Sequence, residues 1–232
     1  MKRLVLVLSL VSATLFGAGS PPAQAATVRL DGVSATVWSH TKQVITVNRT
    51  SGYHARLYLW NKVNGRWVKK LGTSHARIGY GGLVWGSQRQ QGSGTTPMGT
   101  FGLTDSFGKH WRQTGWNLDY RRIRSGDYWV LDNQSDHYNS YRNKSQGGFR
   151  WWLSSGHRDS SELLTDYIEQ YEMAIVINFN TTRQVRHRGG AIFLHINGSG
   201  ATAGCVSVPR STMKSLMAHV DSWKHPVIAI GR

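Results

Sequence analysis

One cysteine and one nearby histidine are the residues of this chain whose types and spacing are best suited to chemistry. Cys205 is the only cysteine among the 232 residues, and His195 precedes it closely. An apolar run ends at His195, a loop rich in glycine and serine follows, and a second apolar run starts at Cys205. We expect the two runs to be adjacent strands, so that the thiol and the imidazole enter one pocket.

Such a pair predicts nucleophilic catalysis. A free cysteine is only about 3 per cent thiolate at neutral pH, and a neighbouring imidazole that accepts the proton makes the nucleophile available. Gly204 has no Cβ, so its peptide can turn the N–H groups around Cys205 toward the oxygen of an attacked carbonyl. The candidate catalytic residues are therefore Cys205, His195 and Gly204. The alternative is a packed small apolar residue beside a hydrogen-bonded core histidine.

We expect no metal site and no cofactor. The other nine histidines are dispersed without ligand spacing, and a second cysteine is absent from the sequence. A Ser-x-x-Lys spacing does occur at Ser211 and Lys214, but the Ser-Asp-Asn and Lys-Thr-Gly partners of a serine acyl-enzyme site are missing. Cys205 is thus the preferred nucleophile.

The first residues predict export. Lys2 and Arg3 form a basic start, residues 4–16 form an apolar core too short to span a bilayer, and Ala23-Gln24-Ala25 fits a small-x-small cleavage site. We expect a signal peptide over 1–25 and a secreted product, a single domain over 26–232. The lone thiol then enters an oxidising compartment without an intramolecular partner.

A large basic surplus indicates anionic surroundings. The formal charge is +16, and without Lys2 and Arg3 it is +14. The basic residues are scattered and no nucleic-acid recognition motif is present, so we expect no nucleic acid partner. Anionic polymers of a cell envelope suit an exported protein better, and the alternative is that the charge only confers solubility.

Strand patterns dominate the sequence and predict a mainly β (α+β) fold, a mixed β-sandwich with a few peripheral helices. Asn64-Gly65 is the pair that a type I′ hairpin requires. Helices are expected over 161–173, capped by Asp159 with Glu162 three residues later, and over 211–223. The segment 105–158 reads as ordered loops. The expected strands are 43–48, 56–62, 66–71, 99–104, 128–131, 173–179, 191–196, 205–208 and 227–230.

Ten tryptophans offer a further possibility, because flat aromatic faces can stack on sugar rings. Trp129 lies in a strand pattern and is expected in the core. Trp111 and Trp116 have polar neighbours, so core packing and glycan binding both remain open for them.

Two motifs resemble the L,D-transpeptidases of the YkuD family. His195 followed by a small-residue loop and Thr202-Ala203-Gly204-Cys205 is similar to the family's histidine strand and its [S/T]-x-G-C signature. Upstream, Thr96-Pro97-Met98-Gly99-Thr100-Phe101 is similar to the family's T-P-x-G-x-F segment. The likeness covers roughly 43–230.

The resemblance implies a mixed β-sandwich enzyme of the bacterial cell wall, a cysteine acyltransferase that acts on peptidoglycan stem peptides and glycan strands. We expect the protein to be a monomer. The cysteine attacks the bond between the third residue of a peptidoglycan stem, a diamino acid, and D-Ala at position four. D-Ala leaves, and an amine of a neighbouring stem or water takes the acyl group. Carried over, Cys205 is the nucleophile, His195 moves the proton, and Gly204 with Cys205 supplies backbone donors.

The chain departs from the family pattern at two positions. Many members have a second histidine directly before Gly-Cys, where this chain has Ala203, and members commonly carry Arg or Asn where Ser207 stands. The expected activity is L,D-transpeptidation. Its rivals are an L,D-carboxypeptidase or endopeptidase with the same fold, and a non-catalytic module that binds glycan and anionic wall polymers.

Overall fold

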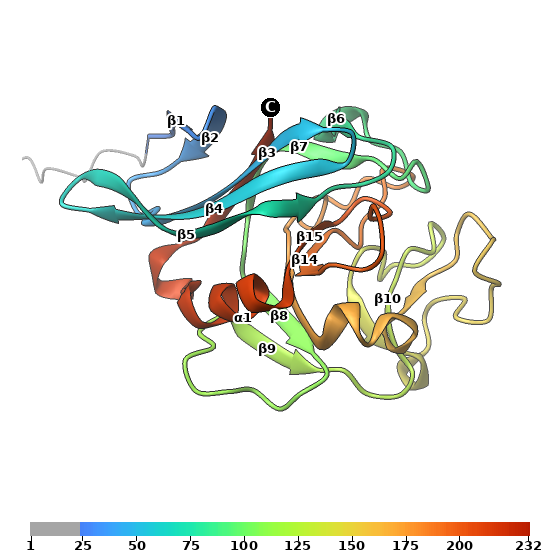
Figure 1. The fold of residues 1–232 in the computed structure, drawn as a ribbon. Coiled ribbons are helices and arrows are strands. Elements are labelled where there is room, and N and C mark those ends of the chain that lie inside the picture. Colours follow the sequence, from blue (N-terminus) through green and yellow to red (C-terminus); the bar gives the residue numbers. More distant parts are fainter. Residues whose placement is uncertain (1–23) are drawn as a thin grey trace, which may run out of the picture.

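The computed structural model describes residues 24–232, and the expected signal peptide over 1–25 lies outside them except for its last two residues. Most of the regular structure is strand, as expected, and eleven strands form one mixed sheet (Figure 1). In spatial order these are β6 (Leu83–Trp85), β7 (Thr96–Gly102), β16 (Val227–Gly231), β3 (Gln43–Ser51), β4 (His54–Val63), β5 (Arg66–Arg77), β15 (Val206–Val208), β14 (Phe193–Ile196), β13 (Met173–Val176), β8 (Asp105–Gly108) and β9 (Asp119–Arg122).

Smaller elements complete the described chain, which contains no helix long and apolar enough to span a membrane. One hairpin and one three-stranded sheet stand apart from the main sheet. They comprise β1 (Ala26–Leu30) with β2 (Val33–Val37), and β11 (Tyr141–Asn143), β10 (Asp127–Trp129) and β12 (Glu162–Leu163). The helices are α1 (Arg210–His219) and the 3-10 turns Gly86–Gln88, Lys144–Gln146, Leu164–Tyr167, Gln170–Glu172 and Ser222–Lys224.

The long hairpin of β4 and β5 confirms the strongest local signal in the sequence. Asn64 has φ +47° and Gly65 has φ +78°, which is the pair of left-handed conformations that a type I′ turn requires. The strands pair from Val63 with Arg66 back to His54 with Arg77. Because β5 runs on past the predicted end at residue 71, it also reaches the strand that follows Cys205.

The sheet has two parts that share a core. β5 and β15 are joined by one registered pair, Ser207 with Arg77, between the β3–β4–β5 part and the β15–β14–β13 part. Buried side chains of both parts belong to one hydrophobic cluster, to which α1 adds Met213, Leu216 and Met217. Each such buried side chain contributes about 1.5–3 kcal/mol relative to exposure. This core fixes β14 and β15 beneath the candidate site.

Side chains alternate across β14 and so separate core from site. Leu194 and Ile196 join the shared core, whereas Phe193 belongs to a second cluster that also contains Cys205. Successive residues of a strand point to opposite faces of its sheet. His195 therefore lies on the same face as Phe193 and Cys205.

The predicted helix over 161–173 is wrong. Glu162 and Leu163 instead pair with β10, and two 3-10 turns follow. The Asp159 carboxylate accepts hydrogen bonds from Asn133 and Arg150 rather than capping a turn. Pairing with a distant strand outweighs the local capping signal here, because Glu162 and Leu163 gain ladder bonds and the Asp159 carboxylate gains an ion pair with Arg150.

The second predicted helix, over 211–223, is confirmed in part, as α1 ends at His219. Gln43 closes this end: its side-chain amide donates to the His219 carbonyl at 2.8 Å and accepts from the Asp221 N–H at 2.9 Å. Val220 is extended, and the Asp221 carboxylate then caps the turn Ser222–Lys224. A residue far away in sequence thus sets the boundary.

The middle of the chain is ordered, with short strands inside the predicted loops. Trp129 is buried, as expected, and donates from Nε1 to the Asn139 side chain at 2.7 Å. Trp116 is only 4% exposed and packs on Tyr120, so it belongs to the core. Trp111 is 71% exposed, and the Arg122 guanidinium lies over its ring. Of Trp111 and Trp116, only Trp111 therefore exposes its ring to solvent.

Candidate active site

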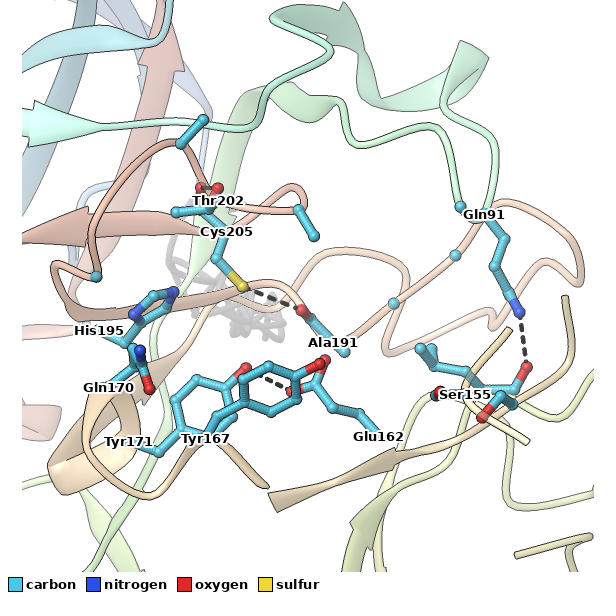
Figure 2. Close-up of a pocket in the computed structure, with 18 of the residues that line it drawn as sticks. Gln91, Ser155, Glu162, Tyr167, Gln170, Tyr171, Ala191, His195, Thr202 and Cys205 are labelled. Carbon is cyan, nitrogen blue, oxygen red and sulfur yellow. Dashed lines mark hydrogen bonds between the residues drawn. The ribbon is translucent and has the colours of Figure 1, made fainter. Parts of the chain in front are cut away.

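The strand register brings Cys205 and His195 to one place. β14 and β15 are parallel neighbours, and Leu194 pairs with Val206, so Cys205 lies beside Phe193. His195 follows two residues later on the same face. Figure 2 shows the imidazole and the thiol side by side at one end of the cavity. The expectation that they meet on adjacent strands holds in the structure.

The Cys205 thiol is buried and has two backbone partners. It is 7% exposed, accepts a hydrogen bond from the Phe193 N–H at 3.3 Å and donates to the Ala191 carbonyl at 3.3 Å. Burial raises the pKa of Cys205 to about 12, and the nearby Glu162 carboxylate acts in the same direction, whereas Arg89 opposes them. The resting thiol is therefore protonated at neutral pH.

The His195 imidazole is neutral and oriented as an acceptor. It is 7% exposed, and its Nδ1 lies 2.8 Å from the Ile196 carbonyl, which can only accept, so Nδ1 carries the hydrogen. Burial lowers the pKa of His195 to about 4. Tyr171 packs edge-on against the ring, with centroids 5.4 Å apart. The free Nε2 lone pair is thus the proton acceptor that the site offers.

Gly204 has a conformational role. Its φ of +137° is one that L side chains rarely adopt, and a Cβ would stand 2.8 Å from Arg89 Nη2 and 3.0 Å from the Thr95 carbonyl. Its N–H already donates to Thr202 Oγ1 at 3.2 Å, and that hydroxyl donates to the Cys205 carbonyl at 2.6 Å. Gly204 N–H is therefore engaged, and Cys205 N–H has no acceptor within residues 24–232.

The two sequence motifs meet at the cysteine. Thr96, the first residue of β7, accepts a hydrogen bond from the Gly79 N–H at 2.8 Å and donates to the Cys205 carbonyl at 3.4 Å. The upstream segment therefore fixes the peptide that carries the thiol, although more than a hundred residues separate them.

A carboxyl group that the sequence pattern assigned to a helix lies in the same cavity. Glu162 accepts a hydrogen bond from the Tyr171 hydroxyl, and burial raises the pKa of Glu162 to about 7. Figure 2 places Glu162, Tyr167 and Tyr171 on the side of the cavity opposite Cys205. No local signal in the sequence distinguishes Glu162, because its neighbours Ser160, Ser161, Thr165 and Asp166 are polar like those of a surface glutamate.

The cavity has a volume of about 600 Å³, large enough for a short peptide segment. It is bounded by residues 89–92, the 155–171 segment, and the chain from residue 189 through the glycine-rich loop to Cys205. Its lining includes Arg89, Gln91, Leu131, Ser155, Arg158, Glu162, Tyr167, Gln170, Tyr171, Ala191, His195, Ser199, Thr202, Ala203 and Cys205.

The two departures from the family motif have different settings. Ser207 is fully buried and donates to the Asn197 side chain at 2.7 Å, so it supports the loop between His195 and Cys205. Ala203 lines the cavity. Ser211, by contrast, is exposed in the first turn of α1 and is not a lining residue. Within residues 24–232, no group of three or more histidine, cysteine or acidic side chains is placed to hold a metal ion.

Comparison with known families agrees with this geometry. The family model for the YkuD L,D-transpeptidase catalytic domain matches residues 42–228. No curated protein and no solved structure matches the chain significantly. The family match covers most of the chain, including the upstream Thr-Pro segment, β14 and Cys205. The chain therefore belongs to the YkuD family of L,D-transpeptidase catalytic domains.

Proposed function

We propose that this protein is an exported peptidoglycan L,D-transpeptidase with Cys205 as nucleophile and His195 as proton carrier. One observation carries the proposal: in a chain of this family, the only thiol shares a cavity with a neutral imidazole whose Nε2 is free. Release of D-Ala from a tetrapeptide stem and joining of third-position residues is the reaction that we assign.

Acylation starts from a neutral pair. As Sγ attacks the carbonyl carbon of the third stem residue, the thiol proton passes to Nε2 of His195, and the carbonyl π electrons move to oxygen. The Cys205 N–H is the backbone donor available to that oxygen. The C–N bond to D-Ala then breaks, its nitrogen takes the proton from His195, and a thioester remains.

Transfer reverses these steps with a new nucleophile. An acceptor amine attacks the thioester carbonyl and gives its proton to His195 Nε2. The C–S bond breaks, and sulfur recovers the proton, so the thiol returns to its resting state. Because burial disfavours both the thiolate and the imidazolium, the pair rests in its neutral form, and the proton moves as the attack proceeds.

The substrate and location follow from the same assignment. The sequence-based signal over 1–25 sends the chain to the cell envelope, where stem peptides and glycan strands occur. The formal charge of +14 without Lys2 and Arg3 suits an anionic wall, and exposed Trp111 and Trp152 are the candidate glycan contacts.

Product analysis tests this function. The protein is incubated with a purified disaccharide-tetrapeptide, and products are resolved by mass. We expect a dimer that has lost one D-Ala, formed by wild type and not by Cys205→Ser. A tripeptide monomer as the sole product would replace transfer by L,D-carboxypeptidase action, and unchanged substrate with folded, reduced protein would contradict both.

A further inference from the structure

Arg89 is a buried cation beside the nucleophile. The residue is 6% exposed, yet it lines the cavity and forms no ion pair with any residue of 24–232. The sequence offers it no local partner either, because no acidic residue occurs between Asp31 and Asp105. A buried charge without a counterion is costly, so such a group commonly has an anionic ligand.

The protein holds this guanidinium in a fixed position. Nε donates to the Thr95 carbonyl at 2.8 Å, and Nη1 donates to the Arg188 carbonyl at 3.0 Å. Phe179 packs against it, with Cζ 5.6 Å from the ring centroid. Two glycines make room: a Cβ at Gly189 would stand 2.0 Å from Nη1, and one at Gly204 would stand 2.8 Å from Nη2.

The third nitrogen is left for a ligand. Nη2 has no acceptor within residues 24–232, whereas every fully buried side-chain nitrogen there has a partner. Nη2 therefore keeps contact with the solvent in the cavity, next to Gly204 and hence one residue from Cys205. Charge-assisted bonds from arginine to carboxylate are among the strongest hydrogen bonds in proteins.

We propose that Arg89 binds the free carboxylate of the donor peptide's leaving residue. This assignment rests on the proposed function, in which Sγ attacks the carbonyl just before a C-terminal D-amino acid. Consecutive residues are 3.8 Å apart, so that carboxylate lies within roughly 4 Å of the attacked carbon. Arg89 Nη2 lies next to Gly204, the residue before the nucleophile, and Arg89 and Cys205 line the same cavity. The site thereby selects donors that end one residue after the attacked bond.

Alkylation of Cys205 tests the site independently of any peptide. Second-order rates are measured at about pH 6 with iodoacetate, which carries a carboxylate one carbon from the reacting atom, and with neutral iodoacetamide. The rate with iodoacetate is divided by the rate with iodoacetamide, and this ratio is divided by the same ratio for a small neutral thiol. We expect a normalised ratio of about ten for wild type and near one for Arg89→Gln. In Arg89→Lys the ratio should be largely restored.

A matched control separates contact from general charge. Arg158 also lines the cavity but is exposed and lies 3.6 Å from Asp159, so Arg158→Gln should leave the ratio unchanged. If Arg89 only favoured the thiolate, Arg89→Gln would slow both reagents equally and keep the ratio, which overturns the proposal. A wild-type ratio of one or less overturns it without any variant, even if Arg89→Gln does not fold.

Peptide donors then separate this proposal from the proposed function. A tetrapeptide donor with a free C-terminus should react at least tenfold faster than its C-terminal amide in wild type, and equally in Arg89→Gln. No turnover of either donor, with the alkylation ratio intact, would contradict the transpeptidase and leave the carboxylate site standing. Turnover of both donors at equal rates by wild type would overturn the role of Arg89 alone.

Discussion

The two walls of the cavity are built in different ways. One wall is regular sheet, in which the register of β14 with β15 and the alternation along each strand place His195 and Cys205. The other wall is the irregular segment with Glu162 and Tyr171, held by pairing with β10 and by packing. The regular wall carries the reacting groups, and the irregular wall supplies the carboxyl that acts on the pKa of the thiol. Changes in the first should abolish chemistry, and changes in the second should adjust it.

The largest effect is expected from Cys205→Ser. An alcohol has a far higher pKa than a thiol and is not activated by the same imidazole, so acyl transfer should be lost. The hydroxyl can keep the backbone partners at Phe193 and Ala191, and thermal unfolding should confirm an intact fold. Retention of more than a few per cent of turnover by a folded Cys205→Ser protein would show that the nucleophile lies elsewhere.

The next effect is expected from His195→Ala. General acid and base help contributes a factor of about 100 to 10,000, and acylation at neutral pH should slow by that amount. The pKa of His195 is about 4, so wild type should keep an active base down to that pH. In the variant the imidazole is absent, so the acylation rate should instead rise steadily with the hydroxide concentration as the pH increases. Identical pH profiles of the two proteins would make His195 a structural residue.

A smaller effect is expected on stability from Glu162→Gln. The folded pKa of about 7 exceeds the usual glutamate value of 4.5, so between these two pH values the folded state holds a proton that the unfolded state releases. Stability from this group therefore falls by about 3 kcal/mol as pH rises from about 4 to 8. His195, whose folded pKa is below its usual value, gives a rise between about pH 4 and 6.5 that opposes it.

Urea unfolding across this range measures the difference. Between pH 4 and pH 8, the free energy of unfolding of Glu162→Gln should increase by about 3 kcal/mol relative to that of wild type. The variant lacks the decrease that Glu162 causes and keeps the increase that His195 causes. Glu169→Gln is the matched control, since its carboxylate is exposed on the same segment and should not change the slope. Parallel curves for wild type and Glu162→Gln would refute the buried carboxyl.

The smallest effect is expected on thiol reactivity. The Glu162 carboxylate raises the pKa of Cys205, so its removal should lower that pKa and speed alkylation by iodoacetamide several-fold at pH 8. At pH 5 the two proteins should react alike, because Glu162 is then protonated in wild type. If the ratio of the Glu162→Gln rate to the wild-type rate stayed constant from pH 5 to 8, this electrostatic coupling would be excluded.

The same contrast explains what the sequence could predict. Asn64-Gly65, the β3, β4 and β5 strands, and the meeting of His195 with Cys205 follow from local chain geometry and side-chain period, and these were confirmed in the fold. The helix over 161–173 failed because Glu162 and Leu163 pair with a strand more than thirty residues upstream. Alternation and caps are local signals, whereas that pairing is not.

Arg89 and the Gly204 N–H show the same limit at the site. Arg89 stands near the upstream motif in sequence, but its distance from the thiol depends on how β7 packs against the Cys205 peptide. The oxyanion donor predicted at Gly204 is taken by Thr202, a hydroxyl only two residues away whose orientation no residue pattern specifies. Residue types identify the reacting groups, and tertiary packing decides which neighbours act on them.

Covalent capture of a carbapenem tests the central claim most directly. An activated thiol opens the strained amide and keeps the acyl group, so intact-protein mass spectrometry should show one adduct per chain. Peptide mapping should place it on Cys205, and Cys205→Ser should not form it. An adduct on Ser211, or none at any concentration with folded and reduced protein, would contradict the assignment of Cys205 as the nucleophile.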